Sequence, residues 1–200
     1  LSLSSVAVGM VKAASSLPVM LLALPAGALA DMMHAIYKCN KPTVARIQGD
    51  CYAGGMGLVA ACDIDVAHES AGFCLSEVRL GLIPATISPY VIRAIGERAS
   101  HRYFLTAERF NAAQAKSMGL VHEVAEGDSL DHVVDTIVQS LLSCSPYAMG
   151  EAKRLLHDVA GETIEPHLIA DTVRRIAEIR ASKEGREGVQ AFLNKRKPSW

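Results

Sequence analysis

The chain has 200 residues, of which 50 % are hydrophobic, and its formal net charge is −1. This length fits one domain, or one domain with a helical appendage, and the composition is sufficient for a sizeable core. Because acidic and basic residues nearly balance, no field would attract nucleic acid or an anionic membrane, and we expect neither as a partner.

The cysteines indicate a reducing compartment. They form an odd set with no C-x-x-C pair and no histidine at ligand spacing: Cys39, Cys51, Cys62, Cys74 and Cys144. We therefore expect a cytoplasmic protein whose cysteines are free thiols and which has no metal site. Cys51 beside the glycines could be a nucleophile, but without a nearby His or Asn a small buried hydrophobe is favoured.

Residues 1–27 imitate a secretory signal, with an apolar run at 17–24 and the small residues Ala28-Leu-Ala30 after it. Pro18 and Pro25 interrupt that run, and an amphipathic pattern crosses the supposed cleavage site. The run is also too short to span a bilayer. We therefore expect an irregular segment over 1–27, with export as the less favoured alternative.

The first half of the chain predicts alternating strands and helices. Residues 31–37 form an amphipathic helix that ends before Asn40-Lys41-Pro42. The β-branched run 43–47 predicts a buried strand, and apolar residues 56–62 predict a short helix. Further strands are expected over 64–67 and 73–75.

Between that first strand and its helix lies a glycine turn, Ala53-Gly54-Gly55. Glycine allows the backbone to turn tightly, and the following helix begins with unpaired N–H groups that can stabilise an anion or a developing oxyanion. Glu77 follows the third strand beside a Gly81/Pro84 turn. By itself, a Gly-Gly pair usually serves close packing, and a single Glu at a strand end is usually a solvated turn residue. Only the glycine turn together with Glu77 indicates chemistry next to a carbonyl.

The second half is predicted to be mainly helical. One helix starts at Ser88-Pro89 and stops at Gly96, another covers 97–105, and Asn111 caps a third that ends before Gly119. A strand over 120–124 follows. Four more helices are expected after it. The first ends at about Leu142 and the second covers 146–159. The third carries an apolar stripe over 164–179, and the last covers 186–192.

Several motifs in this order resemble the crotonase superfamily, the enoyl-CoA hydratases and isomerases. They are Lys41-Pro-Thr-Val-Ala-Arg-Ile-Gln-Gly49, Ala53-Gly54-Gly55, Ala61-Cys-Asp-Ile64, Ser76-Glu77-Val-Arg-Leu-Gly-Leu-Ile-Pro84, Ile95-Gly96, Thr106-Ala-Glu-Arg109, Ala112-Gln-Ala-Lys116, Gly119-Leu-Val121, Gly185-Arg-Glu-Gly188 and Phe192-Leu-Asn-Lys195-Arg. The resemblance covers roughly residues 29–197. Within the superfamily, residues 75–89 look most similar to bacterial methylglutaconyl-CoA hydratases of leucine breakdown.

The resemblance implies an α/β fold, a spiral of ββα turns followed by a helical C-terminal trimerisation region. It divides the chain into an unmatched segment 1–27, an α/β core with the active site over 28–125, and helices over 126–200. It implies a homo-trimer or a hexamer built as a dimer of trimers, with an acyl-CoA as substrate and no other cofactor.

Site residues are implied position by position. Gly54 would donate a backbone N–H to the thioester oxygen, and Glu77 would be the carboxylate that handles water and proton. The other substrate-binding positions line the acyl pocket or close over the ligand, and they are Ala53, Gly55, Ser76, Leu82, Ala85, Phe192 and Lys195. For Phe192 and Lys195, a core side chain and a solvated cation are equally good readings.

The chain departs from the family pattern in two places. Many hydratases carry a second glutamate three residues after the oxyanion glycine, where this chain has Gly57. The family's N-terminal strands and first oxyanion motif, Ala-Gly-x-Asp, are absent from the sequence. An oxyanion hole that lacks one donor loses roughly 10²–10³ in rate.

The expected function is hydration of an α,β-unsaturated acyl-CoA, with Glu77 as general base. Walls of Leu82, Ile83 and Pro84 would partly dehydrate Glu77 and raise its pKa. One alternative is double-bond isomerisation by a single proton-shuttling glutamate. Another, of a different class, is a non-catalytic acyl-CoA-binding trimeric scaffold, and RNA binding finds little support in the charge balance.

Overall fold

The computed structural model describes residues 9–12 and 26–200, and these divide into two compact units. The sheet unit comprises residues 9–12, 26–39 and 43–138, and the helical unit comprises residues 40–42 and 139–200. The division falls inside a helix near residue 138, and the domain boundary expected at 126 stays a prediction.

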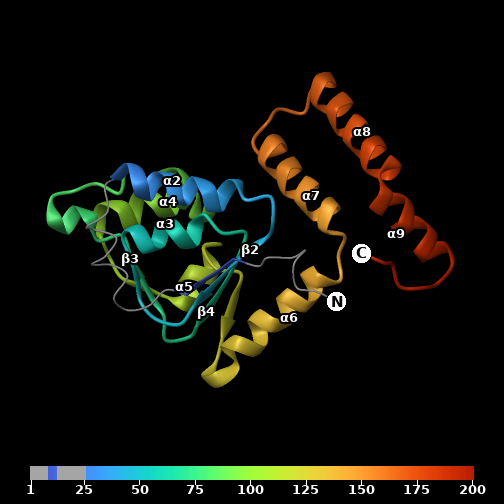
Figure 1. Cartoon of the computed structure of the whole chain (residues 1–200). Coiled ribbons are helices and arrows are strands. Elements are labelled where there is room, and N and C mark those ends of the chain that lie inside the picture. Colours follow the sequence, from blue (N-terminus) through green and yellow to red (C-terminus); the bar gives the residue numbers. More distant parts are fainter. Residues whose placement is uncertain (1–8, 13–25) are drawn as a thin grey trace. The chain divides into compact units, whose positions relative to one another are not determined.

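The sheet unit contains two small sheets and their covering helices (Figure 1). Its elements are β1 (Gly9–Lys12), α2 (Ala26–Lys38), β2 (Thr43–Ile47), β3 (Cys51–Tyr52), α3 (Gly54–Ala60), β4 (Ile64–His68), β5 (Gly72–Cys74), η1 (Glu77–Leu80), α4 (Ser88–Thr106), β6 (Phe110–Asn111), α5 (Ala112–Ser117), β7 (Glu123–Ala125), η2 (Gly127–Ser129) and most of α6 (Leu130–Leu142). The α/β fold class is thereby confirmed.

Four parallel strands form the larger sheet, in the order β1-β2-β4-β7. Because parallel strands need crossover connections, helices separate them in the sequence. The smaller sheet has the order β3-β5-β6, with β3 parallel and β6 antiparallel to β5. Helices α2, α3 and α4 lie together on one side of β2 and β4 (Figure 1).

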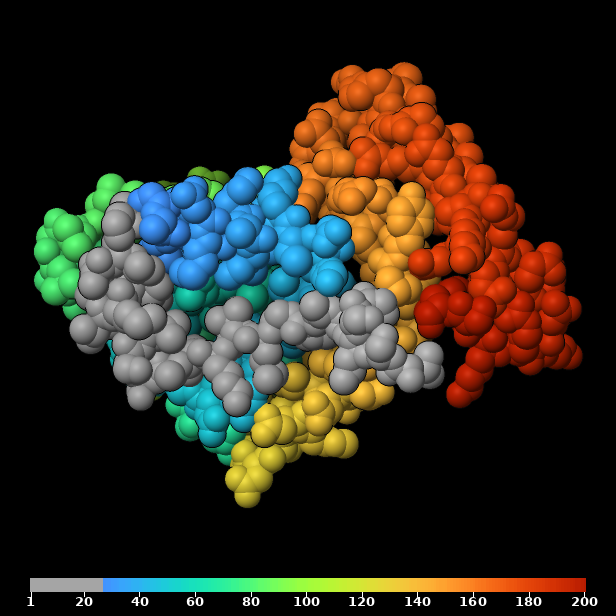
Figure 2. Space-filling model, in the orientation of Figure 1, coloured from blue at the N-terminus to red at the C-terminus, as the bar shows by residue number. Residues whose placement is uncertain are grey.

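The core of the sheet unit consists of buried apolar side chains between these layers. Phe73 stacks on Phe110 with ring centroids 5.6 Å apart, and Tyr103 lies 4.5 Å from Phe110. Met33 on α2 is fully buried, so this helix uses one face for the core. Figure 2 shows the rest of α2, in blue, along the surface of the unit.

The helical unit is formed by the end of α6, α7 (Pro146–Val159), α8 (Pro166–Ala181) and α9 (Lys183–Leu193). Ser145 caps α7 by accepting a hydrogen bond from Ala148 N–H, and its hydroxyl also donates to Glu184 Oε2 at the start of α9. Trp200 Nε1 donates to the Ser143 carbonyl, so the chain end lies along its own helices.

Two expectations for local structure are wrong. Residues 9–12 form a strand and α2 begins at Ala26, so 1–27 is not irregular throughout, although 1–8 and 13–25 lie outside the described residues. The expected strand 120–124 is instead β7 at 123–125. Its first residues cannot join the sheet because Leu120 N–H and Val121 N–H donate back to the Ala115 carbonyl and close α5.

Among residues 9–12 and 26–200, no helix combines the length and apolar character that crossing a bilayer would require. Within the same residues, no group of three or more His, Cys, Asp or Glu side chains is arranged to hold a metal ion.

Candidate active site

The glycine turn connects β3 to α3 through a strained residue. Ala53 has φ 46° and ψ −118°, a positive φ that is uncommon for a residue with a Cβ. No side chain caps α3, and the first amides of a helix have no acceptor within it. Helix α3 begins at Gly54, two residues earlier than expected. The amides of Gly54 and Gly55 are therefore available to a carbonyl oxygen.

A backbone bond joins this turn to the strand that leads to Glu77. Ala53 N–H donates to the Cys74 carbonyl at 3.0 Å, continuing the parallel pairing of β3 with β5. Carboxyl ends of parallel strands meet at one edge of a sheet. The structure thus brings the turn at Gly54 and the segment Ser76–Glu77 to the same edge of the small sheet.

Glu77 begins the short helix η1 and is half-buried. Its Oε2 atom is buried and has no hydrogen-bond partner among the described residues. Burial raises the pKa of the carboxyl above its usual value, and a hydrogen bond to its own backbone offsets part of that effect. A carboxylate with an open oxygen and a raised pKa has the properties of a general base.

The position three residues after Gly54 has no space for a side chain. A Cβ added to Gly57 would overlap Ile87 Cγ2 and would lie 2.6 Å from Met33 Sδ. A second glutamate at this point would require both neighbours to move. The sheet unit is therefore packed for glycine at this position.

The segment after Glu77 turns outward. Gly81 adopts φ 71°, and the side chains of Leu80, Leu82 and Ile83 are 62 %, 52 % and 74 % exposed. Ala85 is also exposed, whereas Pro84 is buried. In Figure 2 the green segment that includes η1 stands at the margin of the sheet unit. Of the three residues expected to wall Glu77, Pro84 is buried, whereas Leu82 and Ile83 are exposed.

Phe192 and Lys195 belong to the helical unit. Phe192 is 82 % exposed, which excludes the reading of a core phenylalanine, and Lys195 has φ 50° in the turn after α9. Arg196 forms an ion pair with Glu187 at 2.6 Å and so fixes this turn against the helix. A contact between these two residues and a ligand stays a prediction.

Cys51 is not suited to be a nucleophile. Its side chain is 2 % exposed, and burial, followed by the charges of Asp65 and Asp50, raises its pKa to about 12. All five cysteines are free thiols, as expected. The reading of Cys51 as a small buried hydrophobe is confirmed.

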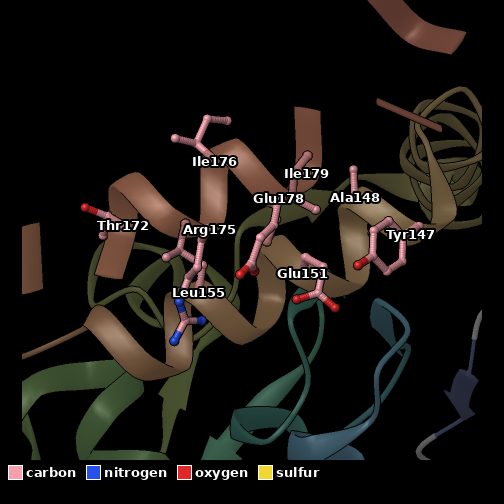
Figure 3. Close-up of a pocket in the computed structure, with 10 residues that line it drawn as sticks. Tyr147, Ala148, Glu151, Leu155, Thr172, Arg175, Ile176, Glu178 and Ile179 are labelled. Carbon is pink, nitrogen blue, oxygen red and sulfur yellow. The ribbon is translucent and has the colours of Figure 1, made fainter. Parts of the chain in front are cut away.

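A pocket of about 220 Å³ lies elsewhere, between α7 and α8 of the helical unit (Figure 3). Tyr147, Leu155 and Ile179 contribute its apolar surface, and Glu151 and Arg175 its charged groups. None of the sequence-predicted site residues lines it. The pocket is therefore separate from the candidate site.

Sequence reasoning missed one ionic contact near the site. Asp50 lies immediately before β3, and its Oδ1 accepts hydrogen bonds from Gly72 N–H at 2.9 Å and from Arg109 Nη2 at 2.7 Å. Because these residues are 22 and 59 positions away, no local pattern in the sequence indicates the contact. The signal that the sequence offered for this ion pair was a charged residue directly before a short strand, at Asp50 and at Arg109.

Comparison with known proteins decides the family. The model of the family described as enoyl-CoA hydratase/isomerase matches residues 20–200. The chain belongs to the enoyl-CoA hydratase/isomerase family. The resemblance inferred from the motifs is thereby confirmed, as is the crotonase-like fold.

Proteins similar to this chain include some that are named hydratases and some that are named isomerases. The enoyl-CoA hydratase AKT6-1 of Alternaria alternata is 36 % identical over 85 % of this chain and 57 % of its own. The peroxisomal Delta(3,5)-Delta(2,4)-dienoyl-CoA isomerase of Arabidopsis thaliana is 34 % identical over 82 % of this chain and 59 % of its own. The chain thus spans little more than half the length of these two relatives.

A solved structure is similar over most of the chain. The crystal structure of an enoyl-CoA hydratase from Shewanella pealeana ATCC 700345 is 41 % identical and superimposes with a TM-score of 0.87. The match covers 96 % of this chain and 77 % of that protein. Sheet and helical elements described above thus have counterparts in an enoyl-CoA hydratase.

Proposed function

We propose that the protein hydrates the double bond of an α,β-unsaturated acyl-CoA thioester, with the Gly54 N–H as oxyanion donor and Glu77 as the base. One observation carries the proposal. The bond from Ala53 N–H to the Cys74 carbonyl puts the Gly54 amide and the segment that carries Glu77, whose Oε2 has no partner among the described residues, at the same edge of one sheet. Family membership supplies the reaction class.

In the proposed reaction, the Gly54 N–H donates a hydrogen bond to the thioester oxygen and stabilises the charge that develops there. The β-carbon then becomes electrophilic. Glu77 takes a proton from water as the water oxygen bonds to the β-carbon, and the resulting enolate receives a proton at the α-carbon. Coenzyme A enters as part of the substrate, and no other cofactor takes part.

The state of Glu77 suits a base that must later return its proton. Because burial raises its pKa above 4.5, the carboxylate binds a proton more strongly than a solvated glutamate does. General acid–base catalysis is most efficient when the pKa lies close to the working pH. The same residue can therefore remove a proton from water and deliver it to the α-carbon.

The packing of Gly57 favours one alternative. A single carboxylate that moves a proton between carbons is sufficient for double-bond isomerisation, and a second one at position 57 would clash with Ile87 and Met33. The Arabidopsis relative is named as an isomerase. Isomerisation is thus the second candidate, at the same two residues.

The acyl group is expected to be small and branched, of the methylglutaconyl type in leucine breakdown. The motif of residues 75–89 supports this proposal. Ala53, Gly55, Ser76, Leu82 and Ala85 would form the acyl site, since they belong to the glycine turn and to the family motif that follows β5. The exposed side chain of Leu82 is available to an acyl chain.

We further propose that copies of the chain associate through α8, as a trimer or hexamer. Ile169, Val173 and Ile176 follow one another at helical spacing and are 53 %, 60 % and 50 % exposed. Helix α8 has no buried residue. Monomeric proteins rarely leave such a stripe uncovered, so a second copy is the proposed occupant.

The test is an assay of the full protein with a small panel of enoyl-CoA thioesters. Hydration predicts loss of conjugated absorbance with 2-enoyl substrates, whereas isomerisation predicts a gain with 3-enoyl substrates. Saturable thioester binding with no turnover of either class would instead establish the non-catalytic scaffold. That result would overturn the proposed function.

A further inference from the structure

A single carboxylate oxygen joins the starts of all three strands in the small sheet. Asp50 precedes β3, Gly72 is the first residue of β5, and Arg109 precedes β6. Oδ1 of Asp50 accepts from Gly72 N–H at 2.9 Å and from Arg109 Nη2 at 2.7 Å. We call these three residues the strand clamp.

The strand clamp is closely fitted. A Cβ on Gly72 would overlap the guanidinium of Arg109, so the guanidinium packs directly against the backbone of Gly72. The hydroxyl of Tyr52 on β3 also reaches Asp50 Oδ2, at 3.4 Å. Contacts from β3 itself, from the start of β5 and from the residue before β6 thus converge on the Asp50 carboxylate.

The ladder that the strand clamp supports is very short. Strand β3 has two residues, and it pairs with β5 at two positions only, Cys51 with Phe73 and Tyr52 with Cys74. Such a brief pairing specifies register weakly. The clamp fixes the amino ends of the two strands, and the Ala53–Cys74 bond is the last backbone contact at their carboxyl ends.

Both proposed reacting groups lie just beyond those carboxyl ends. Gly54 follows Ala53 directly, and Glu77 is three residues after Cys74. A slip of β3 along β5 would therefore move the Gly54 amide relative to the Glu77 carboxylate. Reacting groups must be held to roughly 0.5 Å, and a misplacement of about 1 Å can cost about 10²-fold in rate.

We propose that Arg109 is a positioning residue which, through Asp50, keeps β3 in register with β5 and so sets the distance between the Gly54 amide and the Glu77 carboxylate. Arg109 acts only through the sheet and touches no substrate. The inference rests on the proposed function of Gly54 and Glu77. It adds that the reaction requires the ion pair of Arg109 with Asp50 at the amino ends of β3 and β5, whereas Gly54 and Glu77 follow the carboxyl ends of these strands.

A role in positioning differs measurably from a role in stability. The side chains of Arg109 and Asp50 are 52 % and 43 % exposed. Exposed ion pairs contribute about 0–1 kcal/mol to folding. Removal of this pair should therefore change the melting temperature little, while the geometry beyond Ala53 should change enough to slow turnover.

The experiment compares Arg109→Gln and Asp50→Asn with the wild-type protein. The matched control is Arg102→Gln, because Arg102 pairs with Glu108 at the same 2.7 Å and with side chains exposed by 62 % and 43 %. We expect Arg109→Gln to lower kcat by about 10- to 100-fold with KM within about threefold. Arg109→Lys should recover part of the loss, and Arg102→Gln should behave as wild type.

Amide hydrogen exchange tests the strand clamp without reference to turnover. In Arg109→Gln the amide of Ala53 should exchange at least about tenfold faster, while that of Val66 in the larger sheet stays unchanged. Unchanged exchange at Ala53 would overturn the inference, as would faster exchange with normal kcat. If the wild-type protein converts no enoyl thioester, the proposed function fails, and exchange at Ala53 alone decides whether Arg109 sets the geometry of the turn.

Discussion

The sheet unit and the helical unit differ in where their apolar side chains lie. Phe73, Phe110 and Met33 of the sheet unit are all at most 1 % exposed. In the helical unit, α8 buries no residue and α9 buries only Ala191. The sheet unit can therefore hold a precise arrangement of its own groups, whereas the helical unit leaves apolar faces exposed that a second copy is proposed to cover.

The largest expected effect comes from overfilling the core of the sheet unit. Gly57→Glu forces a side chain against Ile87 and Met33 and buries a charge. We expect unfolding to become easier by more than about 3 kcal/mol, measured by urea denaturation. Gly49→Ala is the control, because a Cβ there meets no atom within 4 Å. Wild-type stability of Gly57→Glu would refute the packing described here.

The second prediction concerns the exposed stripe of the helical unit. Val173→Glu together with Ile176→Glu places charge on the apolar face of α8. We expect the mass in solution, measured by light scattering, to fall to that of one chain, with the sheet unit still folded. Arg174→Gln, on the charged face, should leave the assembly unchanged. An unaltered mass for the double variant would exclude this face as the interface.

The third prediction uses a charge inside the sheet unit. Asp65 is 3 % exposed, its Oδ1 has no partner among the described residues, and burial raises its pKa to about 6. The folded protein therefore binds this proton more tightly than the unfolded chain, so stability is gained as pH falls from about 6 to 4. At pH 8 the buried charge costs stability.

Asp65→Asn removes that cost. A pKa of about 6 against an ordinary 3.8 corresponds to roughly 3 kcal/mol at most. We expect the variant to melt higher than wild type at pH 8 and to lose the advantage near pH 4. The exposed Glu97→Gln should leave the pH dependence as it is. A lower melting temperature for Asp65→Asn at pH 8 would show that the contact of Oδ2 with His122 Nδ1, at 3.6 Å, outweighs the cost of burial.

The smallest effect is expected at the end of the helical unit. Hydrogen bonds from Arg196, then from the Ser199 backbone, lower the pKa of Glu187 to about 2. A depressed acid pKa stabilises the fold above pH 4.5 and loses its effect as pH falls through about 2. Fluorescence of Trp200, the single tryptophan, should stay constant from pH 7 to about 4 and change below that. Glu187→Gln should show the altered signal already at pH 7.

Local patterns in the sequence predicted much of the fold. The β-branched run predicted β2 with its observed bounds, Thr43–Ile47. Asn111 caps α5 in a reciprocal arrangement with Gln114, as expected from its side chain. The predicted stop at Gly96 appears as a kink with φ 76° inside α4. Each of these features depends on residues that are close neighbours in the chain.

Features that depend on distant residues could not be predicted. Ala53 combines a positive φ, which local propensity opposes, with a hydrogen bond from its N–H to the distant Cys74 carbonyl. The strand clamp joins residues 50, 72 and 109, and the space at Gly57 is filled from α2 and the start of α4. The site positions Gly54 and Glu77 were found from motifs, but the contacts that hold them required the structure.

The most direct test of the central claim is the kinetics of Glu77→Gln. The substitution keeps the shape of the side chain and removes the base. We expect kcat for enoyl-CoA hydration to fall by roughly 10²–10⁴, with thioester affinity and melting temperature maintained. Turnover by Glu77→Gln within a few-fold of wild type would contradict the account, because the carboxylate at the edge of the small sheet would then not be the base.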